Sequence, residues 1–350
     1  MRARSPARLN GRAQSPARLH GRATRRVVAV AAAGWVLAAC GNRRSPYMFD
    51  ARGSEAHRVA GLWWLMFALA AGVYAVVGGF ILVAALRGRG TPEGRASRIT
   101  ENAFIWLGGL LVPTVILMVL AVVTVQTTSH LRRPERDPLR IEVVGKRWWW
   151  QVRYPAQRFT TANEVHVPVG RPVEIGIDSD NVIHSFWVPQ LGGKVDTIPG
   201  QHNVWRFRAN RAGTYLGECA EYCGVQHANM RFLVVAEPAA AFDRWVARHL
   251  TPHSAPTSDL TEQGQLLFLR ETCAGCHTVA GTTAQGDEGP DLTDFGSRLA
   301  IGADTVPNDP GNLAGWIADP QSIKPGILMP PTALAPGELH ALVAYLESLR

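Results

Sequence analysis

Two long apolar runs occupy most of the first third of the chain. Residues 59–86 and residues 102–129 contain no charged side chain. A helix needs about 20 apolar residues to cross a hydrocarbon core of about 30 Å. The pattern therefore predicts a hairpin of two transmembrane helices within residues 59–129, at about 59–86 and 104–127.

The short loop between the two runs predicts their orientation. Residues 87–98 carry four Arg against one Glu, and short loops rich in Arg or Lys stay in the cytoplasm. Both ends of the hairpin then lie outside. We therefore expect everything after residue 130 on the outer, periplasmic face of a bacterial cytoplasmic (inner) membrane.

A signal-like segment, residues 25–40, precedes the hairpin. Two arginines followed by apolar residues 27–39 are typical of a secretory signal. The segment ends in Leu-Ala-Ala-Cys, which resembles the lipobox of bacterial lipoproteins and makes Cys40 a candidate for lipidation. The alternative for Cys40 is a buried thiol in an uncleaved helix. Residues 1–24, rich in Arg and with an imperfect repeat, are expected to be a disordered basic extension or a mis-assigned start.

After the hairpin the pattern changes to short β-rich runs separated by Gly, Pro or Asn. Several of them alternate apolar and polar residues. The runs are residues 141–144, 165–169, 173–177, 182–183, 204–207 and 232–235. Short strands at such close spacing predict an all-β sandwich or barrel over residues 131–237.

The last third of the chain has a helical pattern instead. A short amphipathic helix is predicted at residues 239–250, and a linker rich in Pro, Ser and Thr follows up to residue 257. Residues 260–269 and 337–349 predict helices at the two ends of a compact domain, residues 258–350. Because no strand pattern lies between them, we expect this domain to be all-α and the chain to be multidomain.

The net charge of +8 does not describe a nucleic-acid-binding face. Residues 1–26 alone hold eight Arg and no acidic residue. Of the rest, residues 131–257 carry 16 basic and 12 acidic groups, whereas residues 258–350 carry four and 12. We therefore expect no nucleic-acid partner. The opposite charges of the last two domains lead to the hypothesis that they dock by electrostatic complementarity.

The five cysteines are one singleton, Cys40, and two close pairs, which suits ligands better than a disulfide lattice. The first pair, Cys219 and Cys223, is followed closely by His227 and Met230. Sulfur ligands with imidazole select copper or zinc, and a thioether favours copper. Two cysteines can bridge two copper ions, and the second ion then needs another histidine. His184 supplies it; the alternatives are that His184 is a core histidine and that Met230 only packs in the β-domain.

Residues 60–236 resemble the CuA-containing subunit 2 of cytochrome c oxidase. The resemblance implies a cupredoxin-like (Greek-key) CuA domain in which Cys219 and Cys223 bridge two copper ions. It implies His184 and Met230 as the other ligands of one copper ion. For the other copper ion it implies His227 and the carbonyl of Glu221, whose side chain would face a magnesium ion shared with the catalytic subunit.

The resemblance also bears on three residues outside the ligand set. Trp148, in the run Arg-Trp-Trp-Trp, matches the aromatic cluster where electrons reach copper, unless it only packs at a domain edge. Glu101 is either the mouth of a proton channel or an interfacial residue at a helix start. Asn181 replaces an acidic residue that matters in the family for docking a soluble, basic cytochrome c. We therefore expect a tethered domain to deliver the electrons.

The second cysteine pair belongs to Cys273-Ala-Gly-Cys276-His277, the attachment motif of c-type haem. Both thiols would form thioethers, and His277 would be the proximal iron ligand. The segment that ends at Met329 resembles the distal-ligand loop of small cytochromes c, which implies Met329 as the sixth ligand; core packing is the alternative. Residues 258–350 thus resemble a class I cytochrome c domain. Gly289-Pro290 resembles the stretch whose Pro carbonyl orients the proximal imidazole.

These features predict the subunit through which electrons enter a respiratory cytochrome c oxidase, a translocating oxidoreductase. Electrons would pass from a donor cytochrome or a quinol-cytochrome c reductase complex through haem c and copper. Their destination would be the haem-copper catalytic subunit 1, which reduces oxygen to water and pumps protons. The alternatives are the copper subunit of a nitric oxide reductase and a non-enzymatic copper-binding lipoprotein.

Overall fold

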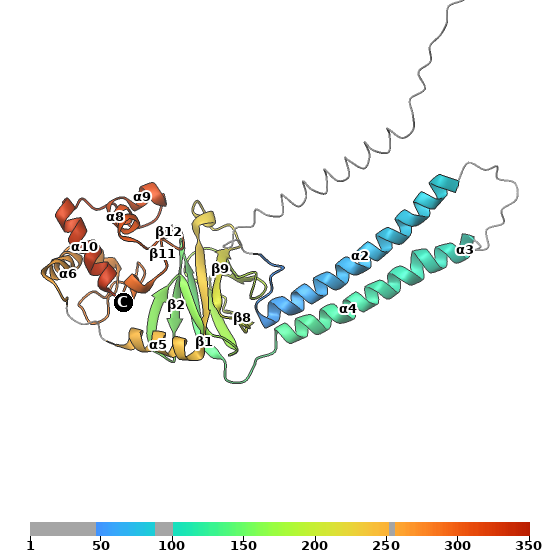
Figure 1. Cartoon of the computed structure of the whole chain (residues 1–350), viewed down its shortest axis with the longest axis horizontal. Coiled ribbons are helices and arrows are strands. Elements are labelled where there is room, and N and C mark those ends of the chain that lie inside the picture. The colour runs from blue at the N-terminus through green and yellow to red at the C-terminus, as the bar shows by residue number, and fades with distance from the viewer. Residues whose placement is uncertain (1–46, 88–100, 252–255) are drawn as a thin grey trace, which may run out of the picture. The chain divides into compact units, whose positions relative to one another are not determined.

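The two apolar runs form long helices that lie side by side (Figure 1). The computed structural model describes residues 47–87, 101–251 and 256–350. Helix α2 spans Ser54–Arg87, and the second run contains α3 (Glu101–Phe104), the π-helical η1 (Ile105–Leu111) and α4 (Val112–Leu131). Both runs are long and apolar enough to cross a membrane. The predicted helical hairpin is confirmed.

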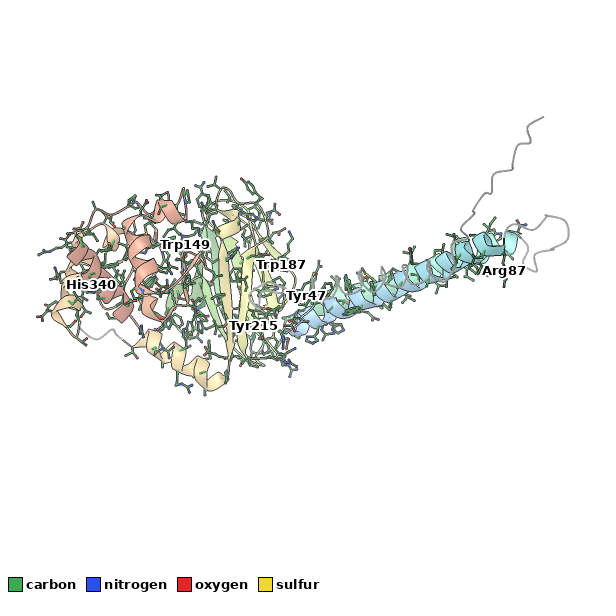
Figure 2. All side chains as sticks on the ribbon, turned by 45° about the horizontal axis from the view of Figure 1, so that its top comes forward. Tyr47, Arg87, Trp149, Trp187, Tyr215 and His340 are labelled. Carbon is green, nitrogen blue, oxygen red and sulfur yellow. The ribbon has the colours of Figure 1, made fainter. Side chains whose placement is uncertain are left out.

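Helix α2 begins at Ser54, ahead of the apolar run, because polar contacts fix its first turn. The Glu55 carboxylate accepts hydrogen bonds from Ser54 Oγ at 2.7 Å and from the backbone N–H of Arg208 at 3.1 Å. A carboxylate in the first turn also favours a helix electrostatically. Side chains project outward along the whole helix, up to the labelled Arg87 (Figure 2).

Three sequence predictions fall partly or wholly outside the described residues. They are the basic extension 1–24, the signal-like segment 25–40 with Cys40, and most of the basic loop between the two helices.

Residues 139–237 fold into two five-stranded sheets, so the predicted β-sandwich is confirmed. The first has the order β3-β2-β1-β5-β8 and the second β4-β10-β9-β6-β7. The strands are β1 (Leu139–Lys146), β2 (Trp149–Tyr154), β3 (Phe159–Ala162), β4 (Glu164–Pro168), β5 (Val173–Ser179), β6 (His184–Trp187), β7 (Val195–Thr197), β8 (Asn203–Phe207), β9 (Gly213–Cys219) and β10 (Arg231–Glu237).

The core between the sheets is built from the buried side of each strand and is rich in aromatic rings. Trp150 packs edge-to-face against Phe186, with ring centroids 5.2 Å apart, and Phe186 stacks on Phe232 at 4.1 Å. Gly217 must be glycine, since a Cβ there would lie 2.2 Å from the Phe232 ring. This core fixes β6, which begins at His184, and β9, which ends at Cys219.

The sequence placed a strand at residues 182–183, whereas the structure begins β6 at His184. Side-chain hydrogen bonds hold residues 179–182 in a turn. Ser179 Oγ donates to the carbonyl of Val182, and the N–H of Val182 donates to Asn181 Oδ1. Asn and Ser commonly compete in this way with strand pairing.

Helix α5 (Ala239–Leu250) has the predicted bounds and packs its apolar face on the sandwich. Trp245 is buried and stacks on His166 with ring centroids 4.1 Å apart. At the end of the helix, His249 Nε2 lies 2.8 Å from Asp294 Oδ2 of the C-terminal domain. Residues 46–350 form one compact unit.

The C-terminal domain is mainly helical. Its elements are α6 (Asp259–Arg270), α7 (Cys273–Cys276), η3 (Phe295–Ser297), β11 (Ala300–Ile301), β12 (Val306–Pro307), α8 (Pro310–Ala318), α9 (Pro320–Ile323) and α10 (Pro336–Ser348). The two predicted terminal helices are present as α6 and α10. They cross closely at Gly264, where a Cβ would lie 2.1 Å from the carbonyl oxygen of Ala341. The sequence showed no strands here; β11 and β12 are a two-residue pairing that closes one loop.

Candidate metal centre and haem cavity

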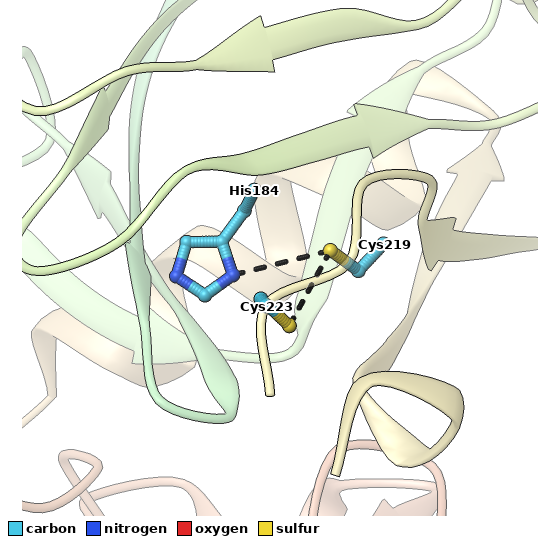
Figure 3. Close-up of side chains that lie close together, drawn as sticks. All are labelled: His184, Cys219 and Cys223. Atoms are coloured by element: carbon cyan, nitrogen blue, oxygen red, sulfur yellow. Dashed lines mark hydrogen bonds between the residues drawn. The ribbon is translucent and has the colours of Figure 1, made fainter. Parts of the chain in front are cut away.

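Three buried side chains meet at one end of the sandwich. His184 Nδ1 lies 3.9 Å from Cys219 Sγ, and the sulfurs of Cys219 and Cys223 are 3.8 Å apart (Figure 3). Their ligand atoms all lie within 4.8 Å of one another. His184 comes from the start of β6, Cys219 from the end of β9, and Cys223 from the loop that follows β9. Residues far apart in the sequence therefore share one site.

The remaining predicted copper ligands surround this cluster. Cys223 Sγ lies 3.7 Å from both His227 Nδ1 and Met230 Sδ. Cys219 Sγ lies 3.1 Å from the backbone carbonyl oxygen of Glu221. A short 3-10 helix, η2 (His227–Asn229), turns the chain so that His227 and Met230 face the same sulfur. All six predicted positions therefore converge.

The donor set fits a pair of copper ions. Both cysteines are free, and a soft set of two sulfurs, two imidazoles and a thioether suits copper. The hydrogen bond between Cys219 and Cys223 lowers the pKa of the Cys219 thiol. The same hydrogen bond and burial raise the pKa of the Cys223 thiol. Because the thiolate is the form that binds metal, the site already favours it at Cys219.

Asn181 orients one of the imidazoles, a role that the sequence did not reveal. Its Oδ1 lies 3.2 Å from His184 Nε2 and accepts a hydrogen bond from it, while Nδ1 faces Cys219. A hydrogen bond to the second ring nitrogen fixes the tautomer of a ligand histidine. The sequence drew attention to Asn181 only because it lacks a charge. An amide three residues before a ligand histidine was the signal that could have indicated this contact.

The haem attachment motif and Met329 line one cavity of about 230 Å³. Most of its wall is apolar, and Cys273, Cys276 and His277 lie on it together with Met329. Gln321 Nε2 shapes the Met329 loop by donating to the carbonyls of Ile327 and Met329, both at 2.8 Å. An apolar cavity with two thiols, an imidazole and a thioether fits a c-type haem.

The proximal imidazole is held in one orientation by its neighbours. His277 Nδ1 donates to the carbonyl oxygen of Pro290 at 2.7 Å, the contact that the Gly-Pro segment predicted. Burial lowers the pKa of His277, which favours the neutral ring. Nε2 is then the ring nitrogen that would bind haem iron.

Gly289 leaves room for this ring, and we expect Gly289→Ala to disturb it. A Cβ at residue 289 would lie 2.5 Å from His277 Cε1. Overpacking of this kind costs about 1–3 kcal/mol, so the melting temperature of the haem-loaded protein should fall and the haem spectrum should change. Gly337→Ala is the matched control, since Gly337 lies in the same domain outside the attachment motif and a Cβ there meets nothing within 4 Å. Equal effects of the two substitutions would contradict the prediction.

The three consecutive tryptophans lie in three different environments. Trp150 is fully buried in the core, and Trp149 is half-buried beneath the ammonium of Lys146. Trp148 lies in the turn before β2, lines the haem cavity and donates from Nε1 to the carbonyl of Cys223 at 2.9 Å. Gly224 permits this approach, since a Cβ there would lie 2.9 Å from the Trp148 ring.

Two predicted residues lie outside both clusters. The Glu221 carboxylate is about half exposed and lies 3.9 Å from Lys194 Nζ, while the Glu221 carbonyl lies near Cys219. Glu101 is the first residue of α3.

Comparison with known proteins gives a consistent picture. A family profile described as the periplasmic domain of cytochrome c oxidase subunit II matches residues 155–237, and a cytochrome c profile matches residues 261–350. Cytochrome c oxidase subunit 2 of Alkalihalophilus pseudofirmus is 36% identical over 278 residues, covering 77% of this chain and 80% of that protein. The Bacillus subtilis subunit 2 is 31% identical over 291 residues, covering 77% and 82%. The solved periplasmic domain of subunit II of cytochrome oxidase from Bradyrhizobium japonicum is 32% identical, covers 33% of this chain and 96% of that chain, and has a TM-score of 0.32.

Proposed function

Since this chain belongs to the cytochrome c oxidase subunit 2 family, we propose that it transfers electrons in a particular order, from an outside donor to haem, then to copper, then to the catalytic subunit. Its general role as the electron-transfer subunit of a haem-copper oxidase, with a CuA-like site and a fused cytochrome c, follows from the family and the site. Two helices anchor the chain in the membrane, with the cupredoxin-like domain on the periplasmic side.

Each cofactor, when bound, takes up and releases one electron at a time. The six positions His184, Cys219, Glu221, Cys223, His227 and Met230 would hold the copper pair. Cys273 and Cys276 would attach the haem covalently, and His277 and Met329 would bind its iron. Methionine in place of a second histidine raises the reduction potential of a haem, which suits delivery to an oxidase.

The position of Trp148 carries the proposed order of transfer. Its ring lines the haem cavity, and its N–H donates to the backbone of Cys223, a copper ligand. One buried side chain therefore contacts both sites, with 8% of its surface exposed. Among the three tryptophans, Trp148 alone has a hydrogen bond to the copper loop in the described structure. We infer that electrons pass from the haem to copper past this side chain.

Trp148→Phe should slow this step by about 100-fold, because the smaller ring loses the bond to Cys223 and small displacements at a reacting site have effects of that order. The experiment reduces the haem of the purified oxidase with a light pulse and follows the copper absorbance. Trp149→Phe is the control, since Trp149 lines the same cavity but has no side-chain hydrogen bond to the copper loop among the described contacts. Equal rates for the two variants would exclude Trp148 as the connecting side chain.

The family also suggests a magnesium site, a proton-channel residue and an electron donor for this chain. The half-exposed Glu221 carboxylate is available to a magnesium ion shared with catalytic subunit 1, and EPR of a manganese-substituted complex tests this. Glu101, at the start of α3, is proposed as the mouth of a proton channel. The number of protons pumped per electron by the Glu101→Gln complex tests this assignment.

A donor cytochrome or a quinol-cytochrome c reductase complex would supply electrons to the haem. Oxygen reduction and proton pumping belong to the catalytic subunit.

A further inference from the structure

Lys324 is buried without a carboxylate partner among the described contacts. Only 2% of its surface is exposed. Its Nζ donates to three backbone carbonyls: those of Trp148 at 2.9 Å, Asn229 at 2.7 Å and Gly302 at 2.7 Å. Lysine is almost never fully buried unless it is paired. Here all three donors of the ammonium are used, so the site is built for a cation.

The three carbonyls belong to different functional segments. Trp148 is the tryptophan between the two sites, and Asn229 precedes the copper ligand Met230. Gly302 lies in the haem domain, where Lys324 itself begins the segment that leads to Met329. One ammonium group therefore joins the segment that leads to Met329 to the loop that leads to Met230, and it also binds the backbone of Trp148.

Neighbouring contacts extend the same junction. Gln226 Nε2 donates to the carbonyl of Pro325 at 2.7 Å. Two backbone N–H groups also donate across it, Arg231 to the carbonyl of Ala303 at 3.2 Å and Leu299 to Glu164 Oε1 at 2.6 Å. These hydrogen bonds are directional and come from three different segments, so they fix the orientation in which the two domains meet.

Burial lowers the pKa of Lys324 to about 7, and the charge interaction with Cys223 acts against this shift. The ammonium donates to three carbonyl oxygens in this site. An apolar side chain would avoid the cost of burying a cation. It would also leave three buried carbonyls without a donor, which is costly. The lysine therefore favours a single arrangement of the two loops rather than general adhesion between the domains.

We propose that Lys324 is the positioning residue that docks the haem domain on the copper domain, with the haem cavity against Trp148. This inference rests on the proposed function, because it assigns to Lys324 the geometry of haem-to-copper transfer.

The test compares Lys324→Met with the unchanged chain in the purified oxidase complex. Two amides report docking directly, Leu299 and Arg231, because their N–H groups are bonded across the junction. We expect their hydrogen exchange to become about tenfold faster, since the loss of a few hydrogen bonds shifts an equilibrium by that order. Haem-to-copper transfer after a light pulse should slow by about tenfold or more. Lys324→Gln, which keeps two N–H donors, should recover part of both effects.

Lys146→Met is the matched control. Lys146 is bonded to Asp180 within the copper domain, and none of the described hydrogen bonds or ion pairs joins it to the haem domain. Amide exchange within β8, which contains none of the substituted residues, should stay unchanged in every variant and so report an intact sandwich. If the Leu299 and Arg231 amides and the transfer rate are the same in Lys324→Met as in the unchanged chain, Lys324 has no positioning role. Faster exchange with an unchanged transfer rate also overturns the proposal.

The failure of the proposed function has a different signature. The unchanged chain would then show no haem-to-copper transfer at all. In that case the amide exchange of Lys324→Met still decides whether the lysine docks the two domains.

Discussion

Cys219→Ser is expected to remove the dinuclear copper centre and to reduce oxygen uptake by the complex to background. Cys219 Sγ contacts the sulfur of Cys223, the imidazole of His184 and the carbonyl of Glu221. A serine hydroxyl is a hard, protonated donor that does not replace a bridging thiolate. Copper content, the mixed-valence EPR signal and the optical spectrum of the purified complex measure the loss.

The haem spectrum of the same variant should be unchanged, because the haem attachment motif lies in the C-terminal domain, whose hydrophobic core is separate from the core that contains Cys219. Tyr222→Phe is the control, as this side chain lies in the same loop, is 73% exposed and only loses its hydroxyl group. A Cys219→Ser complex that kept the mixed-valence signal would show that copper is bound elsewhere.

His277→Ala should abolish turnover driven by a donor cytochrome while leaving the copper site intact. The ring lines the haem cavity and is fixed by its bond to the Pro290 carbonyl. Its loss would remove the proposed proximal iron ligand. The reduced haem spectrum and steady-state oxygen uptake with a cytochrome donor are the measurements, and donor-driven turnover is expected at background.

A small-molecule reductant should still reduce copper in His277→Ala, because it does not depend on the haem. His340→Ala, on the exposed surface of α10 (Figure 2), is the matched histidine control and should behave like the unchanged chain. If donor-driven turnover survived in His277→Ala, the donor would reach copper directly, and the tethered haem would not be the route of electron input.

The sequence predicted those parts whose signal is local. Transmembrane runs, the amphipathic α5 and the alternating strands β1 and β5 each carry their own periodicity. The ligand residues were also predictable, since metal and haem sites demand particular residue types at short spacing. Their convergence depended on one distant residue, His184, which no local spacing links to the two cysteines; the need of a second copper ion for another histidine pointed to it, and the resemblance supported it.

Strand β2 was missed for a physical reason. Trp149–Tyr154 is buried on both faces over its central residues, so it lacks the alternation that marks a half-exposed strand. Even Gln151 is buried there, and Arg153 donates to its side chain. A strand of this kind cannot be distinguished by periodicity from other apolar runs.

The junction between the two domains could not be predicted from charge totals. Net charges led to the hypothesis of electrostatic docking, which remains a prediction. The described contacts across the junction are mostly short hydrogen bonds to the backbone, and the cation in them comes from the acidic domain. Only the folded chain brings Lys324 to the carbonyls of Trp148 and Asn229, 176 and 95 residues away.

The use of carbonyl oxygens by Lys324 has a consequence for how the chain tolerates change. Every residue type presents the same backbone carbonyl, so a substitution at Asn229 keeps the acceptor of the hydrogen bond from Lys324. The sequence requirement of the junction therefore rests on position 324 itself, one of only three lysines in the chain. A haem domain transplanted onto another copper domain would carry Lys324 with it. Docking would then require only that the loops equivalent to those of Trp148 and Asn229 keep the same backbone path.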